Sequence, residues 1–340
     1  MHKRRLIASF VCFVAPLTIL APGKAQNASP RTKSRSADRR NLPRTPDGHP
    51  DLQGVWTNST LTPLERPPQF ADKPVLSAAE AAAFEKQSLT EGNRDRRDGG
   101  AEADVGRAYN ELFFDRGDKL ARVDGQIRTS MIVDPPDGRI PALTPEAQKR
   151  QEATRQQARL HPADGPEDRS LAERCLFWAT AGPPMLPGPY NNSYQIYQTP
   201  GYVTIFSEMI HESRIIPLDG RAHLPASVRK WTGDSIGRWE GDTLVIDTTN
   251  FTDKTRFRGS DENLHIIERL TRVAPDTINY RFTIDDPTAF TRPWTAELPF
   301  LASTGRVYEY ACHEGNYALA DILKGARAQE ESGRTRTPAR

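Results

Sequence analysis

The chain has few of the residues on which compact catalytic motifs depend. Its 340 residues include three cysteines and seven histidines, and aromatic residues make up only 8%. It contains no Gly-x-x-x-x-Gly-Lys-Ser/Thr run, no His-Glu-x-x-His and no Cys-x-x-Cys. These absences argue against a P-loop nucleotide site, a zincin-type metal centre and a dithiol redox site. The sequence therefore predicts no cofactor and no metal.

Basic charge is scarce in the central part of the chain. The whole chain carries +2, but residues 1–25 hold four basic and no acidic side chains. Segments 26–50 and 324–340 carry net charges of +4 and +3, which leaves −9 on residues 51–323. Because a nucleic-acid-binding surface needs clustered Lys and Arg on the folded body, this distribution argues against a nucleic-acid partner.

Long apolar runs are confined to the N-terminus. A basic Lys3-Arg4-Arg5 precedes an apolar stretch over residues 6–21, and small residues follow it. This pattern predicts a signal peptide over residues 1–25 and a periplasmic or secreted protein. The alternative is a membrane anchor, but the run is short and Pro16 interrupts it, so we expect no stable anchor.

Two cysteines, Cys175 and Cys312, remain after such a cleavage. In an oxidising compartment they form a single possible intramolecular disulfide, which would tie the segment before the main sheet to its last strand. The alternative is two separate buried thiols.

Turn and capping signals divide the rest of the chain. We expect a flexible leader over 26–45, a single domain over 46–326 and a disordered tail over 327–340. Ser77-Ala78-Ala79-Glu80 predicts a capping box that opens a helix to about Ser88. Thr144-Pro145 predicts a second helix to about Leu160. Residues 91–106 are expected to form a mobile loop.

From residue 190 onward the apolar pattern changes to a period of two. Strands are predicted at 194–198, 202–208, 213–218, 238–240, 243–249, 264–273, 277–285, 294–300 and 307–312, and a short earlier one at 129–133. Short connectors such as Glu240-Gly241-Asp242 favour antiparallel neighbours. The predicted fold class is mainly β, an antiparallel up-and-down barrel or barrel-like meander with two short peripheral helices.

Two resemblances agree with this fold. Gly54-Val55-Trp56 resembles the Gly-x-Trp signature of lipocalin-like barrels, a resemblance of architecture. The chain also resembles a large family of secreted bacterial proteins without an established activity, which implies secretion and a single domain. The runs that carry this second resemblance are Pro46-Asp47-Gly48-His49-Pro50-Asp51-Leu52, Ile215-Ile216-Pro217-Leu218-Asp219-Gly220-Arg221, Gly237-Arg238-Trp239-Glu240-Gly241-Asp242-Thr243-Leu244-Val245 and Tyr308-Glu309-Tyr310-Ala311-Cys312-His313-Glu314-Gly315-Asn316-Tyr317.

Histidines beside carboxylates are the candidate catalytic groups. His211 stands between Glu208 and Glu212 at a predicted turn, and His313 is followed by Glu314. A carboxylate neighbour holds a histidine in position and raises its basicity, and histidine titrates near neutral pH. If both turns lie at one mouth of the barrel, they share a site. The alternatives are a polar surface turn and tyrosine-rich strand ends that cover the core.

Aromatic and polar residues of the meander are the candidate ligand contacts, because they offer apolar area and hydrogen bonds. They are Trp239, Tyr308, Tyr310 and Tyr317, together with Glu268 and Arg214. Glu268 is expected to face inward and to need a cationic partner, either Arg214 or Arg281.

The predicted function is binding of a small, partly apolar molecule in a β-barrel pocket. The first alternative is a secreted acid–base enzyme, an isomerase, lyase or hydrolase with a His–carboxylate site. The second is a structural protein of the envelope.

Overall fold

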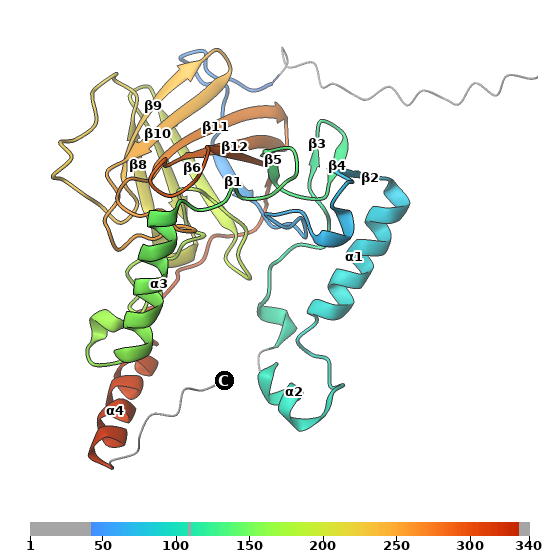
Figure 1. The fold of residues 1–340 in the computed structure, drawn as a ribbon. Coiled ribbons are helices and arrows are strands. Elements are labelled where there is room, and N and C mark those ends of the chain that lie inside the picture. The colour runs from blue at the N-terminus through green and yellow to red at the C-terminus, as the bar shows by residue number, and fades with distance from the viewer. Residues whose placement is uncertain (1–41, 108–109, 333–340) are drawn as a thin grey trace, which may run out of the picture. The chain divides into compact units, whose positions relative to one another are not determined.

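Nine antiparallel strands form a nearly closed barrel, as the sequence predicts (Figure 1). The structure is a computed structural model that describes residues 42–107 and 110–332. The predicted signal peptide and most of the predicted leader lie outside the described residues. The barrel strands are β1 (Gly54–Thr57), β6 (Ser193–Thr199), β7 (Tyr202–Ser207), β8 (Ser213–Pro217), β9 (Asp234–Glu240), β10 (Thr243–Thr249), β11 (His265–Ala274), β12 (Thr277–Asp285) and β13 (Trp294–Ala302).

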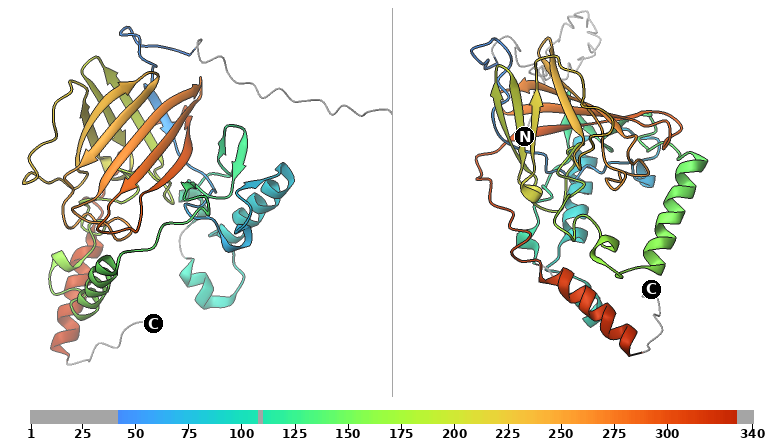
Figure 2. Two further views of the ribbon diagram at one scale, coloured as in Figure 1. Left: turned by 45° about the horizontal axis from the view of Figure 1, so that its top comes forward. Right: turned by 90° about the vertical axis from the view of Figure 1, so that its left-hand side faces the viewer.

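The order of strands around the barrel follows the chain. β1 pairs with both β6 and β13, and β6 to β8 and β9 to β13 are sequential antiparallel neighbours. Figure 2 shows the long strands β10 to β12 running side by side in one wall. The connectivity is therefore that of an up-and-down barrel in which residues 58–192 are inserted between the first barrel strand, β1, and the second, β6.

Alternation along the strands fills the barrel interior with apolar side chains. On β12, Ile278, Tyr280, Phe282 and Ile284 are fully buried, while the residues between them reach the surface. The rings of Tyr280 and Phe300 lie 5.0 Å apart, and Trp294 packs edge-on against Phe282. Such burial stabilises the fold by roughly 1.5–3 kcal/mol per large side chain.

Residues 58–192 carry the helices α1 (Ala78–Gly92), α2 (Gly100–Gly106) and α3 (Pro145–Leu160). They also carry a small sheet of β2 (Val75–Leu76), β3 (Arg122–Val123) and β4 (Gln126–Arg128), and the strand β5 (Ile132–Asp134), which pairs with β13. The predicted capping box is present, because the Ser77 side chain accepts from the Glu80 amide while the Glu80 carboxylate accepts from the Ser77 amide. Thr144 caps α3 as expected.

Three local expectations for residues 58–192 are wrong. Helix α1 runs to Gly92, because residues 89–91 favour a helix and no breaking residue precedes Gly92. The expected mobile loop contains α2. The short strand expected at 129–133 is β5, three residues further along.

The largest error concerns the C-terminus. A fourth helix, α4 (Tyr317–Glu331), begins where the Asn316 side chain accepts from the Leu319 amide. It overlaps the expected disordered tail. Arg327 fixes it by donating to the carbonyl oxygens of Ala163 and Asp164.

The barrel closes between β8 and β9 at a glycine. These two edge strands share no ladder, yet a Cβ placed on Gly237 would lie 2.7 Å from Leu218 Cδ2 and 2.8 Å from Ile216 Cγ2. A side chain at position 237 would therefore push the edges apart.

We expect Gly237→Ala to lower the free energy of unfolding by about 1–3 kcal/mol, since overpacking forces the neighbours to shift. Urea denaturation measures the change. The matched control is Gly201→Ala, where a Cβ meets nothing within 4 Å and the change should stay within about 0.5 kcal/mol. Equal effects of the two substitutions would contradict the role assigned to Gly237.

Candidate functional site

The turn that carries His211 has a strained backbone. The 3-10 turn Met209–His211 joins β7 to β8, and Ile210 and His211 have φ values of 61° and 48°. Positive φ is unfavourable for a β-branched residue such as isoleucine, and strain of this kind gathers at functional sites. Burial of Ile210 beside Met209 and the Cys175–Cys312 disulfide offsets the cost.

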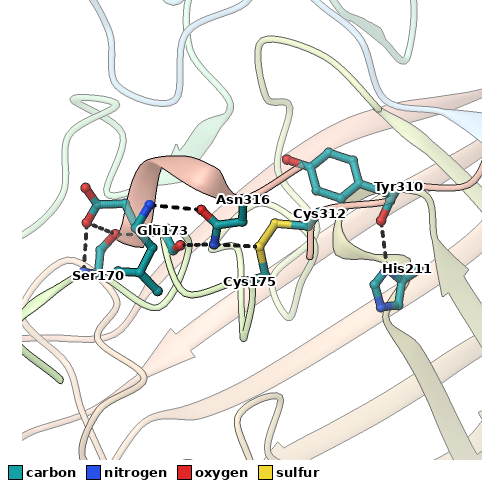
Figure 3. The surroundings of a disulfide bond; sticks show 8 residues. Ser170, Glu173, Cys175, His211, Tyr310, Cys312 and Asn316 are labelled. Carbon is teal, nitrogen blue, oxygen red and sulfur yellow. Dashed lines mark hydrogen bonds between the residues drawn. A yellow bond between two sulfur atoms is a disulfide. The ribbon is translucent and has the colours of Figure 1, made fainter. Parts of the chain in front are cut away.

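The His211 ring is oriented by a backbone carbonyl. Its Nδ1 lies 3.0 Å from the carbonyl oxygen of Tyr310 (Figure 3). Because a carbonyl oxygen only accepts, Nδ1 carries the proton and donates. In the neutral ring Nε2 is therefore an acceptor, the form that a general base requires.

Residues 306–316, which we call the C-terminal segment, lie against this turn. The strand predicted at 307–312 does not form, because the segment is bound by side chains and not by a neighbouring strand. The Tyr308 amide donates to Glu208 Oε1 at 3.0 Å, and the Tyr310 carbonyl accepts from His211.

A disulfide fixes the far end of the C-terminal segment. Cys175 and Cys312 are joined with an S–S distance of 1.96 Å (Figure 3). Asn316 Nδ2 donates to the Glu173 carbonyl at 2.7 Å beside it. The disulfide joins cysteines 137 positions apart in the sequence and links the segment to the loop that precedes β6.

His211 and His313 line one hollow of about 420 Å³, which we call the histidine hollow. Its floor is the directly opposed pair Gln195 on β6 and Phe206 on β7, and the C-terminal segment forms its other wall. Gln195 and Phe206 alternate with buried residues, so they face away from the barrel interior. The hollow therefore lies on the outer face of the barrel wall, not at the expected mouth.

Other candidate residues divide between the hollow and the rest of the barrel. Tyr308, Tyr310 and Glu314 line the hollow with the two histidines. Glu212 does not line the hollow. Its Oε1 accepts from Thr232 Oγ1 at 3.3 Å, and burial raises the pKa of its carboxyl group.

The two remaining aromatic candidates lie elsewhere. Trp239 stacks on His49 with ring centroids 4.6 Å apart. Tyr317 is the first residue of α4 and is 76% exposed.

Glu268 and Arg214 form the expected inward pair inside the barrel. Arg214 on β8 donates through Nη1 and Nη2 to Glu268 Oε1 and Oε2 at 3.2 and 2.5 Å. Tyr280 donates to Glu268 Oε1 at 2.7 Å, and burial holds the Tyr280 pKa well above its usual value. The side chains of the pair are 4% and 0% exposed, so it has no access to a solvent-borne ligand.

One motif was missed in the sequence. Gly233-Asp234-Ser235-Ile236-Gly237 fits the Gly-x-Ser-x-Gly pattern of serine hydrolases. That motif acts at a strand-to-helix turn, whereas Ser235 lies within β9. Its hydroxyl bonds to Thr248 Oγ1 at 2.9 Å and accepts from Arg214, so the serine belongs to the buried polar network.

A second histidine cluster, whose grouping the sequence did not predict, lies on β10, β11 and the loop before β9. Nε2 of His223 and Nε2 of His265 lie 3.1 and 3.0 Å from Asp247 Oδ1. The hydrogen bond with Asp247 raises the His265 pKa, and in return the Asp247 pKa is lowered. The spacing of these residues in the sequence carries no signal, because three separate segments supply them.

Within residues 42–107 and 110–332, no group of three or more His, Cys, Asp or Glu side chains has a geometry that could hold a metal ion. No helix of this described part is long and apolar enough to cross a membrane. No protein-family model, curated protein or solved structure matches the chain, so the resemblance to a secreted family stays a prediction.

We expect Arg214→Met to lower the free energy of unfolding by about 3–5 kcal/mol, because it leaves the Glu268 carboxylate buried without a cation. The double variant Arg214→Met/Glu268→Gln removes that charge and keeps an acceptor for Tyr280, so it should recover most of the loss. Chemical denaturation of the parent, the two single variants Arg214→Met and Glu268→Gln, and the double variant gives the comparison. Simple additivity of the two single substitutions would contradict the pairing.

Reduction of the Cys175–Cys312 disulfide should lower stability by about 5 kcal/mol, the chain-entropy figure for a loop of this length. The paired substitution Cys175→Ser/Cys312→Ser should give a similar loss without any reductant. Tyrosine fluorescence should also change, since Tyr310 packs on the disulfide cluster. A double variant as stable as the parent would show that the non-covalent contacts suffice.

Proposed function

We propose that the protein is exported and binds a small, partly apolar molecule in the histidine hollow. The observation that supports this most is the convergence of His211 and His313, from segments about a hundred residues apart, in one hollow with Tyr308, Tyr310 and Phe206. Its volume of about 420 Å³ lies in the usual range for small-molecule sites.

The barrel interior is a less suitable place for the ligand. The interior aromatic side chains are buried and contact one another, so they act as core. The polar atoms of Arg214 and Glu268 are already paired there. The outer wall offers what the interior does not, which is exposed histidines under a tyrosine-rich cover.

Acid–base catalysis is the second candidate function, and the state of His211 supports it. The Tyr310 carbonyl fixes the proton on Nδ1 and leaves Nε2 to accept a proton. His313 lies in the same hollow and would serve as the acid, with Glu314 next to it in the chain. A pair of this kind suits isomerisation, elimination or hydrolysis of the bound molecule.

Thermal-shift screening of the purified protein against aromatic and lipid-like compounds tests the binding proposal. A compound at about 100 times its Kd should stabilise the protein by about 2.7 kcal/mol and raise Tm by several degrees. His211→Ala and His313→Ala should each reduce this response. His161→Ala, which removes a surface pair with Asp164, is the control and should keep it.

Four outcomes decide among the functions. Stabilisation without turnover supports a binder, and turnover that is lost in the His211 variant supports an enzyme. Stabilisation that both histidine variants retain would place the ligand elsewhere. No response to any compound would instead favour a structural role in the envelope.

A further inference from the structure

A second hollow lies on the other side of the C-terminal segment. It has a volume of about 650 Å³ and shares Tyr308 and Tyr310 with the histidine hollow. Its remaining aromatic lining is Phe113, Phe114 and Tyr190, so we call it the aromatic hollow. Four separate parts of the chain build it: residues 112–115, residues 190–193, Glu208 directly after the end of β7 and the C-terminal segment.

The apolar lining of this hollow is unusually exposed. Leu112 is 88% exposed, Tyr308 67% and Phe113 54%. Single exposed apolar side chains are common, but here three of them gather around one concave site. Such a patch is typical of a ligand-binding surface.

Glu208 supplies the charge in the aromatic hollow. This residue is 6% exposed, lines the hollow and forms no ion pair with any described residue. Its Oε1 accepts a hydrogen bond from the Tyr308 amide at 3.0 Å. A buried carboxylate is costly without a cation, so Glu208 presents an unmet requirement for positive charge.

The other charged residues agree with this sign. Among the lining residues, Asp115 adds a second carboxylate and the exposed Arg306 is a cation, so the lining carries a net charge of −1, while Arg94 and Arg116 lie over the Phe114 ring outside that lining. Aromatic faces attract cations through the ring quadrupole, and rings gathered around a carboxylate suit an ammonium group. A guanidinium already lies over one face of Phe114, where Arg116 is 4.3 Å from the ring centroid.

We propose that the aromatic hollow binds an organic cation, an ammonium group on a compact apolar or aromatic body, with Glu208 as its counter-ion. This site is separate from the proposed function, because Glu208 and Phe113 line the aromatic hollow and not the histidine hollow. Glu208, predicted as a partner of His211, thus acts on the other side of the C-terminal segment.

Isothermal titration with benzyltrimethylammonium tests the proposal on the whole protein. We expect saturable binding that weakens as salt is added, and no binding of the neutral benzyl alcohol at the same concentrations. Glu208→Gln keeps an acceptor for the Tyr308 amide and removes the charge, and it should weaken binding roughly tenfold. Glu297→Gln, at an equally buried carboxylate on β13, is the control and should leave the affinity unchanged.

Two further variants keep the proposal testable if Glu208→Gln does not fold. Phe113→Leu retains apolar bulk but loses the ring, and it should weaken binding about threefold. Arg306→Gln removes the like charge and should strengthen binding. Absence of binding to the parent protein would overturn the proposal, as would benzoate binding that Arg306→Gln abolishes.

Discussion

The bidentate contact between Arg214 and Glu268 is the constraint on which the barrel depends. Arg214 is on β8, one of the two edge strands that do not pair with each other, and Glu268 is on β11 in the opposite half of the sheet. Arg214 also donates to Ser235 on β9, so one guanidinium spans the gap that no ladder bridges. Two buried charges favour a single geometry, because any displacement leaves them unpaired in a medium of low dielectric constant.

Because the interior of the nearly closed barrel is filled, the proposed binding sites lie on its outer wall. The small Gly237 lets β8 and β9 approach, and the interior then has room only for packed side chains. The outer face of β6 and β7 is covered by the C-terminal segment, which is held at three points: Glu208, His211 and the disulfide. Because the segment has no ladder of its own, its position depends on these side chains. They also define the walls of both hollows.

Sequence reasoning succeeded where local pattern determines structure. The alternation in β12 and the capping box at Ser77 both identify elements whose stabilising contacts are local or periodic. It failed at residues 307–312, where a strand-like sequence is held by tertiary contacts instead. Adjacency to a carboxylate drew attention to His211 and His313, but the Glu208 carboxylate accepts from the Tyr308 amide, a contact that adjacency does not indicate. Phe113 and Tyr190, which share its hollow, come from the insertion after β1, and no spacing rule connects them to β7.

The shared wall of the two hollows has a thermodynamic consequence. Tyr308 and Tyr310 belong to both sites, so a ligand in either one acts on the same short segment. The left-handed turn at Ile210 and His211 meets this segment through the contact of the His211 ring with the Tyr310 carbonyl and through the packing of Ile210 in the disulfide cluster, and the disulfide limits how far the segment can move. Ligands that favour the same position of the segment would bind with positive coupling, and ligands that favour different positions would compete without touching. Linkage requires this coupling to be equal in both directions. A ligand that changes the affinity of the histidine hollow through the shared segment would therefore have its own affinity for the aromatic hollow changed by the same factor.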